Sequence, residues 1–206
     1  IAPGTVLVDT STVSPATAKQ VAASLQEVGA GFVDAPVSGG VEGAKKGTLS
    51  VMAGGDSANI SRIMPVLEAI SGTVTHMGPV GSGQATKAVN QVMIAGIAEA
   101  VCEALALGEK LNLPSERLLS IVGAGAASSW FLEHRGKTML ENSFDVGFKL
   151  SLLLKDLLIC QDLARELDIS MPTTEAAIRD YRELVALGDG NHDISGLIRL
   201  KRGVDG

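Results

Sequence analysis

Aromatic residues, cysteines and histidines are all scarce in this chain of 206 residues. Phe, Trp and Tyr make up 3% of the sequence while 46% is hydrophobic, so the core must be built from aliphatic side chains. Cys102 and Cys160 stand in apolar, helix-like sequence, which predicts buried free thiols in a reducing compartment rather than a disulfide framework. The histidines lack metal-ligand spacing, so no zinc site is expected; they are His76, His134 and His192.

Positive charge is also in deficit. A net charge of −6 argues against a general affinity for nucleic acid or for anionic membranes, although local backbone donors can still bind a small anion. No membrane span is expected, because Glu99 and Glu103 interrupt the most apolar stretch, Val92–Leu107. The sequence shows no signal peptide, so we expect a cytoplasmic protein. It runs at once into a predicted strand, which suggests that a preceding part of the fold is missing.

The first part of the chain alternates strands with helices, which implies an α/β layered sheet. The apolar run Thr5–Asp9 suits a buried parallel strand. Ser14 then reads as a helix N-cap, followed by Pro15 at the first helical position. The expected strands are residues 5–9, 31–36, 49–53 and 73–77, and the expected helices are residues 15–29 and 58–70.

The pattern changes near Gly78. A helix of about 30 residues is expected from Ser82 to Asn112, far longer than the usual ~11–12, and its nearly uniform apolarity between Val92 and Ala98 predicts burial in protein. A small α/β unit is therefore expected over residues 1–79 and an all-helical unit over residues 80–206. Further helices are expected at 115–123, 149–167 and 174–187, with a turn or helix start at 128–131 and a loop from residue 188 that has room for a short terminal helix.

Lys87 is the first candidate for chemistry. On a helix, Lys87, Asn90 and Gln91 stand at i, i+3 and i+4 on one face. The small neighbours Ala85 and Ala88 favour a partly desolvated lysine, and desolvation in general moves a lysine toward proton transfer near neutral pH. The same spacing fits a solvent-exposed lysine at a helix start equally well.

Two glycine-rich segments are candidates for ligand binding. Gly78–Gly83 lets a ligand or another backbone approach the N-terminus of the long helix, or serves as an interdomain turn. The strand ending in Ser38, Gly39 and Gly40 presents backbone N–H groups at the carboxyl edge of a parallel sheet, where they suit a carboxylate. The alternative for this second segment is a plain glycine-rich turn.

Two further polar groups have open interpretations. Ser11 and Thr12 are hydroxyls at the carboxyl end of the first strand, and they are either ligand contacts or local turn formers. Lys155 and Asp156 form a charged pair in a very apolar helix. That pair is either structural, or its lysine reaches a ligand.

Together these motifs resemble the β-hydroxyacid dehydrogenase family, which includes 3-hydroxyisobutyrate dehydrogenase, tartronate semialdehyde reductase and related glyoxylate reductases. The resemblance follows the family's order and spacing over essentially the whole chain. The matching stretches are DTSTVSP (9–15), DAPVSGGVEGAKKGTLSVMAGG (34–55), GPVGSGQATKAVNQ (78–91) and LLLKDLLICQDLA (152–164).

The resemblance implies a fold and an activity. Residues 1–79 would be the C-terminal part of a Rossmann-type doubly wound domain, joined by a long interdomain helix to the all-helical domain 80–206. The implied activity is an NAD- or NADP-dependent oxidoreductase that interconverts a small β-hydroxy acid and its semialdehyde or keto acid, of tartronate semialdehyde or 3-hydroxyisobutyrate type. A small carboxylate is the implied substrate, and a homodimer or homotetramer is the implied assembly.

The resemblance also implies roles for single residues. Lys87 would be the catalytic general acid/base, and the Asn90-Gln91 pair is similar to that of tartronate semialdehyde reductases. The implied substrate-binding residues are Ser11, Ser38, Gly39, Gly40, Asn90 and Gln91, and the implied cofactor-binding residues are Thr12, Phe148 and Lys155.

One departure from the family is serious, because the sequence has no G-x-G-x-x-G motif to cradle the cofactor pyrophosphate. We therefore expect these 206 residues alone to bind cofactor poorly and to turn over slowly or not at all. Two alternatives stay open. One is an enzyme similar to 6-phosphogluconate dehydrogenase, although that family has His-Asn where this chain has Asn90-Gln91. The other is a catalytically silent oligomerisation or binding module.

Overall fold

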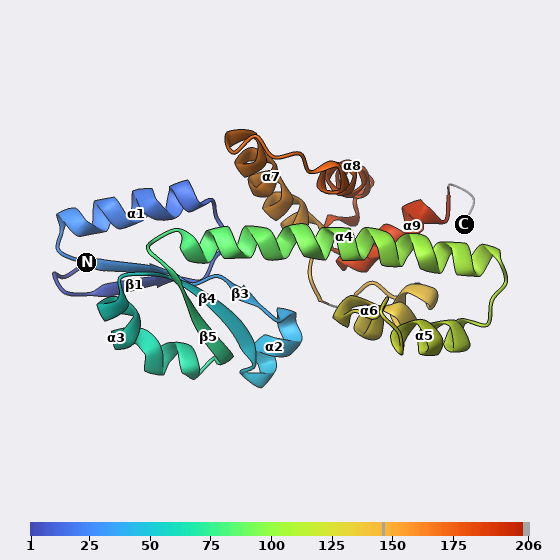
Figure 1. Cartoon of the computed structure of the whole chain (residues 1–206), viewed down its shortest axis with the longest axis horizontal. Helices are drawn as coiled ribbons and strands as arrows, with labels where there is room; N and C mark the ends of the chain where they lie inside the picture. The colour runs from blue at the N-terminus through green and yellow to red at the C-terminus, as the bar shows by residue number, and fades with distance from the viewer. Residues whose placement is uncertain (146, 204–206) are drawn as a thin grey trace. The chain divides into compact units, whose positions relative to one another are not determined.

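The computed structural model describes residues 1–145 and 147–203 (Figure 1). The chain forms two compact units, Ile1–Asn90 and Gln91–Gly206, and each is described by itself. The long helix α4 (Ser82–Lys110) gives its first turns to the first unit and the rest to the second. It has the length expected from the sequence. The functional domain boundary near residue 79 stays a prediction.

The first unit is built on one sheet. β1 pairs with β2 in parallel, and β4 pairs with β5 in parallel, whereas β2 and β3 both run antiparallel to β4. The sheet is therefore mixed. Its strands are β1 (Val6–Asp9), β2 (Gly31–Asp34), β3 (Val37–Ser38), β4 (Leu49–Gly55) and β5 (Ser71–Gly78).

The expected strand 31–36 is shorter than predicted. β2 ends at Asp34, because Pro36 has no N–H to donate to a sheet ladder, and the chain resumes as β3. Ser38 thus lies four residues, or about 13 Å of extended chain, beyond the end of β2. It precedes a short helix, α2 (Gly40–Lys46), which is not among the helices expected from the sequence. The expectation of a purely parallel edge at Ser38 was wrong.

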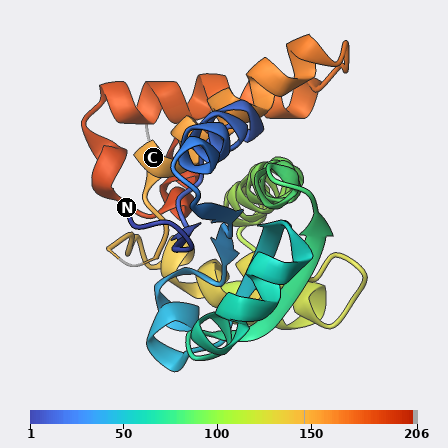
Figure 2. The same ribbon diagram turned by 90° about the vertical axis from the view of Figure 1, so that its left-hand side faces the viewer.

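Alternation along the strands assigns the two faces of the sheet. Phe32 packs with α1 (Pro15–Glu27), whereas the next residue, Val33, packs with α3 (Ser57–Glu68). Successive side chains of a strand point to opposite faces, so the two helices cover opposite sides, as Figure 2 shows. The predicted cap of α1 is confirmed, since Ser14 Oγ accepts from the Thr17 N–H at 3.0 Å.

The second unit is helical, as expected. Its remaining helices are α5 (Ser115–Gly123), α6 (Trp130–Leu140), α7 (Leu150–Glu166), α8 (Pro172–Ala186) and α9 (Ile198–Lys201), with short 3-10 turns at Asp189–Asn191 and Ile194–Leu197. Ser129 caps α6 by accepting from the Leu132 N–H at 3.1 Å, so the helix start suspected at residues 128–131 is confirmed. The rest of α6 was not expected from the sequence, because it contains Gly136 and scattered polar residues.

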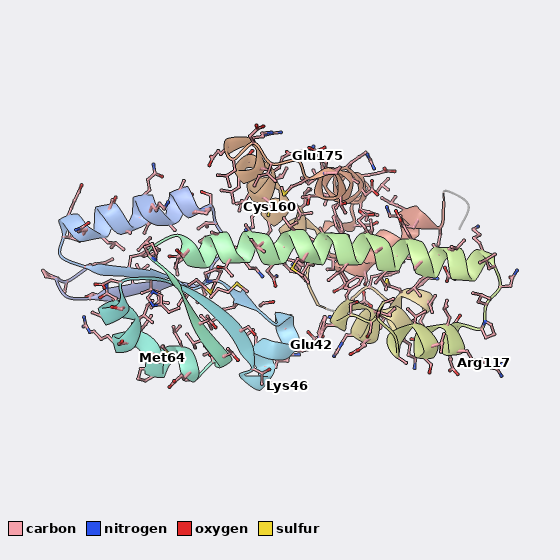
Figure 3. All side chains as sticks on the ribbon, in the orientation of Figure 1. Glu42, Lys46, Met64, Arg117, Cys160 and Glu175 are labelled. Carbon is pink, nitrogen blue, oxygen red and sulfur yellow. The ribbon has the colours of Figure 1, made fainter. Side chains whose placement is uncertain are left out.

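Aliphatic residues dominate both cores, as the shortage of aromatics predicted. Cys102 on α4 and Cys160 on α7 are buried free thiols (Cys160 is labelled in Figure 3). Burial raises the pKa of Cys160 to about 11 and that of Cys102 still further, so neither is a thiolate near neutral pH. The prediction of buried free thiols is confirmed.

α4 is long and apolar enough to span a membrane by length and composition, although the sequence analysis expected Glu99 and Glu103 to prevent this. Half of its most apolar window is buried inside the protein, which is also typical of a core helix. Its polar residues have protein partners: Glu99 pairs with Lys201, and Gln91 bonds to Asp156. These contacts favour a helix buried in protein.

An ion cluster around Lys201 ties α9 to α4 and α8. The Lys201 ammonium lies 2.6 Å from the Asp180 carboxylate and 2.5 Å from the Glu99 carboxylate. Burial raises the pKa of Glu99 even with Lys201 beside it. Burial also disfavours the Lys201 ammonium, but its bonds to Asp180 and Glu99 outweigh this and raise its pKa above the ordinary lysine value.

Replacing Lys201 with Met should lower the free energy of unfolding by about 3 kcal/mol near neutral pH, because the buried Glu99 carboxylate loses the Lys201 cation while Asp180 keeps its pair with Arg179. The loss should shrink as the pH falls from about 8 to about 5. A carboxyl whose folded pKa lies above its unfolded value is penalised at high pH and relieved once it is protonated. Urea unfolding at several pH values measures both effects.

Arg165→Met is the matched control, because the Arg165–Asp162 pair is exposed on both sides and should contribute less than about 0.5 kcal/mol. A Lys201→Met protein as stable as the original, or a difference that grows as the pH falls, would contradict this account of the cluster.

Candidate active site

The loops that follow β1 and β2 begin side by side, because Asp9 and Asp34 are register partners at the ends of these strands. The Asp9 carboxylate accepts from the Ser11 N–H at 2.9 Å, which turns the chain at once. Ser11 is exposed and Thr12 is half-buried. Both hydroxyls therefore stand at the carboxyl end of β1, where open α/β folds bind ligands.

Asp34 fixes the N-terminus of α4 to the end of β2. Its fully buried carboxylate accepts from the Gly81 N–H at 2.7 Å and from the Gln84 N–H at 2.9 Å. A carboxylate at a helix N-terminus is stabilised by the unpaired N–H groups and the helix dipole. Burial nevertheless raises the pKa of Asp34, although these N–H donors lower it in part.

Glycines at the start of α4 and at the end of β4 allow this close approach of helix and sheet. A Cβ on Gly83 would lie 2.3 Å from the Met52 carbonyl oxygen and 2.7 Å from that of Asp34. A Cβ on Gly54 would lie 2.6 Å from Oδ1 of Asp34, and Gly81 adopts a φ of +92°. The sequence left open a ligand or a second backbone at this helix end; the structure shows the second backbone, with a carboxylate of the protein itself.

Gln84 joins the loop after β1 to α4. Its side chain is 1% exposed, its Oε1 accepts from the Val13 N–H at 3.1 Å, and its Nε2 donates to the Ser11 carbonyl at 2.8 Å. Neither Gln84 nor Asp34 is among the site residues expected from the sequence. Each is a polar residue within or beside a glycine-rich motif. That signal does not show that it bonds to a residue 47 to 73 positions away.

Lys87 follows Gln84 by three residues, so the two side chains neighbour each other on α4. Lys87 is 8% exposed, and Asn90, one turn further, is half-buried. The expectation of a partly desolvated lysine is therefore confirmed over that of a solvent-exposed one, and the helix of Lys87 is tied to the loop that carries Ser11 and Thr12.

Ser38, Gly39 and Gly40 form the start of α2. Gly39 and Gly40 have φ values of +128° and +62°, a conformation that other residues rarely adopt. Within the described part of the chain, no side chain caps α2 at Gly39. Ser38 is half-buried and both glycines are exposed, so this turn can offer backbone N–H groups to an anion.

Gln91 and Lys155 meet at one carboxylate in the second unit. Gln91 is 1% exposed, and its Nε2 donates to Oδ2 of Asp156 at 2.6 Å. The Lys155 ammonium lies 2.8 Å from Oδ1 of the same carboxylate, with its own side chain 47% exposed. Gln91 thus has a structural partner as well as its predicted position on the face of Lys87, and Lys155 keeps a solvent-facing part.

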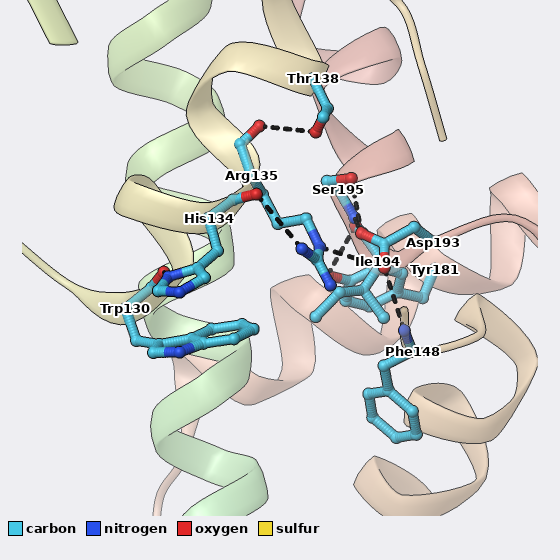
Figure 4. A network of polar contacts seen from close by, with 9 residues as sticks. All are labelled: Trp130, His134, Arg135, Thr138, Phe148, Tyr181, Asp193, Ile194 and Ser195. Atoms are coloured by element: carbon cyan, nitrogen blue, oxygen red, sulfur yellow. Dashed lines mark hydrogen bonds and ion pairs between the residues drawn. The ribbon is translucent and has the colours of Figure 1, made fainter. Parts of the chain in front are cut away.

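Phe148 is held by a buried ion pair (Figure 4). Its N–H donates to Oδ2 of Asp193 at 3.0 Å, and the same carboxylate lies 3.4 Å from Arg135. Ser195 donates to Oδ1 of Asp193 through both its N–H and its hydroxyl. A Cβ on Gly147 would collide with Asp193 and Arg135. The backbone at Phe148 is therefore fixed, while its ring is half-buried.

Gly83→Ala should displace the start of α4 from the sheet, because the added Cβ cannot fit between the Met52 and Asp34 carbonyl oxygens. We expect a loss of at least about 2 kcal/mol in unfolding free energy. Gly96→Ala in the same helix is the control. Its Cβ would meet only Thr173, at 3.7 Å, and alanine favours helix by up to about 1 kcal/mol over glycine. Equal stabilities of the two variants in urea unfolding would contradict the proposed close packing of the start of α4 against the sheet.

Both parts of the chain match known families. Residues 81–201 match the family described as "NAD-binding of NADP-dependent 3-hydroxyisobutyrate dehydrogenase". Residues 1–78 match the family described as "NAD binding domain of 6-phosphogluconate dehydrogenase".

Curated relatives and solved structures agree with these matches. The chain is 37% identical to 2-hydroxy-3-oxopropionate reductase of Escherichia coli, over 95% of this chain and 67% of that protein. It is 36% identical to 2-(hydroxymethyl)glutarate dehydrogenase of Eubacterium barkeri, over 96% and 66% respectively. A crystal structure of 3-hydroxyisobutyrate dehydrogenase from Salmonella typhimurium is similar with a TM-score of 0.89 at 30% identity, over 97% of this chain and 70% of that chain.

Sequence and fold therefore lead to one family. The chain spans about two thirds of the length of the curated relatives that it matches. The match over residues 81–201 alone covers more than half of the chain, and the relatives above 30% identity cover nearly all of it. The chain belongs to the 3-hydroxyisobutyrate dehydrogenase family of oxidoreductases, which use NAD or NADP.

Proposed function

We propose that the protein interconverts a small β-hydroxy acid and its semialdehyde or keto acid with NAD or NADP, and that Lys87 is its general acid/base. One observation carries the proposal. Lys87 is 8% exposed and stands in the first turns of a helix that Asp34 and Gln84 tie to the carboxyl ends of β1 and β2. Ligands of open α/β folds bind at such strand ends.

The names of relatives support a short hydroxy acid as the substrate class. 2-Hydroxy-3-oxopropionate, also called tartronate semialdehyde, and L-serine are both three-carbon acids with a substituent oxygen at carbon 3. The first appears in the name of the Escherichia coli relative, and the second is present with a similar 3-hydroxyisobutyrate dehydrogenase structure from Mycobacterium tuberculosis. We propose the tartronate semialdehyde type, with 3-hydroxyisobutyrate as the next candidate.

The proposed carboxylate site is the turn Ser38, Gly39 and Gly40, helped by Ser11 and Asn90. Both glycines are exposed with positive φ, and an anion bound by backbone N–H groups needs no positive side chain. We propose that Gln91 acts indirectly, because its amide is bonded to Asp156. The substrate-contacting part of the Asn-Gln pair is then Asn90.

The residues present fit one end of a nicotinamide cofactor. The Thr12 hydroxyl stands at the carboxyl end of β1, and Lys155 has a half-exposed cationic side chain that suits a phosphate or amide oxygen. Phe148 offers an aromatic wall on a fixed backbone. No G-x-G-x-x-G motif is available among these 206 residues for the pyrophosphate. The bound cofactor supplies or accepts the hydride.

Lys87 has the complementary task of moving a proton. In reduction, negative charge develops on the substrate carbonyl oxygen as its carbon gains hydride, and the Lys87 ammonium gives that oxygen a proton to form the hydroxyl. In oxidation, the neutral Lys87 amine takes the hydroxyl proton. The N–H groups at Gly39 and Gly40 would hold the carboxylate, so that the reacting oxygen stays within reach of the lysine.

Lys87→Met in the full-length protein should lower kcat about 1000-fold, the scale on which a general acid/base acts, while folding and assembly are preserved. Lys46→Met on α2 is the control, because Lys46 is exposed. Turnover is measured with a panel of small semialdehydes and both cofactors. Unchanged turnover in Lys87→Met would overturn its role.

The same assays test the two alternative functions. A full-length protein inactive on the whole panel would favour a silent oligomerisation module, and a preference for 6-phosphogluconate would favour an enzyme similar to 6-phosphogluconate dehydrogenase.

The isolated 206-residue chain should bind NADPH weakly, because it has no glycine-rich loop whose backbone can approach the pyrophosphate. Fluorescence titration with NADPH measures the affinity, and a micromolar dissociation constant comparable to that of a complete dehydrogenase would contradict the prediction.

The choice between NAD and NADP is usually made about 20 residues after the G-x-G-x-x-G motif. A cytoplasmic location remains a prediction from the sequence, and a homodimer or homotetramer remains a prediction from the family resemblance.

A further inference from the structure

We propose that Gln84 is a positioning residue that clamps the loop after β1 to the lysine helix and so sets the distance between the loop hydroxyls and Lys87. This inference rests on the proposed function of Lys87. Neither the family resemblance nor any motif in the sequence singles out Gln84.

The contacts of Gln84 are those of a clamp. Its amide accepts from the Val13 N–H and donates to the Ser11 carbonyl, so it grips the backbone on both sides of Thr12. A primary amide is the neutral side-chain group that offers a donor and an acceptor side by side. At 1% exposure the amide is closed off from solvent, so it is committed to the loop.

The helix end of the clamp is fixed as well. The Gln84 backbone N–H donates to Oδ2 of Asp34, and Oδ1 of Asp34 holds Gly81. A chain of bonds therefore runs from the end of β2, through the first turn of α4, to the loop after β1. Lys87 follows three residues later on the same helix, a spacing that puts the Cβ atoms of the two residues about 5–6 Å apart.

This arrangement predicts a larger effect on turnover than on stability. The loop backbone at Ser11 and Val13 is part-buried, so water can replace part of the two hydrogen bonds that are lost with the Gln84 amide. The loop itself stays anchored by Asp9 and by the Ser14 cap. The position of the loop hydroxyls relative to Lys87, however, is no longer fixed, and a misplacement of about 1 Å can cost about 100-fold in rate.

The test is Gln84→Met in the full-length protein, which keeps side-chain length and removes both bonds. We expect kcat/KM to fall about 100-fold while the melting temperature changes by a few degrees. Gln84→Glu keeps the acceptor for Val13 and sets a second carboxylate oxygen against the Ser11 carbonyl, so it should also lose activity. Ile63→Val, in the core on the α3 side of the sheet, is the control for a small stability loss and should leave kcat/KM unchanged.

A double-mutant cycle with Ser11→Ala separates positioning from stability. If the clamp acts by placing Ser11, then Ser11→Ala should cost several-fold less in kcat/KM on the Gln84→Met background than on the original protein. Additive losses in kcat/KM, or a Gln84→Met protein with the original kcat/KM, would overturn the inference.

The two proposals fail in different ways. If Lys87→Met keeps full turnover, the role of Lys87 fails whatever Gln84 does. If Lys87→Met is inactive while Gln84→Met retains full kcat/KM, the clamp alone fails. The pH profile adds a readout, because a limb due to Lys87 should survive in Gln84→Met and vanish in Lys87→Met.

Discussion

The buried carboxylate of Asp34 is the interaction on which the candidate site depends. Taking a carboxylate fully out of water costs several kcal/mol unless donors replace the water, and here the donors are backbone N–H groups at the start of α4. The bonds join residues 47 and 50 positions apart, so they bind helix to sheet rather than stabilise local structure. Gly54 and Gly83 are needed because any Cβ there would push the carboxylate and the helix apart.

This use of the helix N-terminus bears on where we propose that a substrate anion binds. The first N–H groups of α4 are occupied by Asp34, so they are not available to a ligand carboxylate. The turn before α2 is different, because Gly39 and Gly40 are exposed there and no side chain of the described residues caps the helix at Gly39. One helix N-terminus is therefore bonded to the sheet, and the other, shorter one is the carboxylate site that we propose. Lys87 belongs to α4, the helix that is bonded to the sheet, and this position suits a group that must be rigidly placed.

Local patterns predicted local structure well. Ser14 and Pro15 predicted the start of α1, and continuous apolarity predicted the long α4, because caps and helix periodicity are encoded in neighbouring residues. Pro36 is also a local signal, and its effect on β2 was underestimated. Helical spacing correctly placed Gln91 on the face of Lys87 but did not predict Asp156, because spacing along one helix carries no information about a residue 65 positions away. Asp34 and Gln84 were missed for the same reason.

The frame around Lys87 and the residues that would recognise a substrate are chemically separate. The frame consists of bonds to backbone N–H and carbonyl groups and of glycines that permit close approach, and none of these distinguishes one hydroxy acid from another. The proposed recognition residues, by contrast, act through side chains such as those of Ser11 and Asn90. The relatives named for 2-hydroxy-3-oxopropionate and for 2-(hydroxymethyl)glutarate are accordingly similar to this chain in sequence to nearly the same degree. Family membership therefore fixes the type of oxidoreductase, while the substrate depends on a few side chains carried by a shared frame.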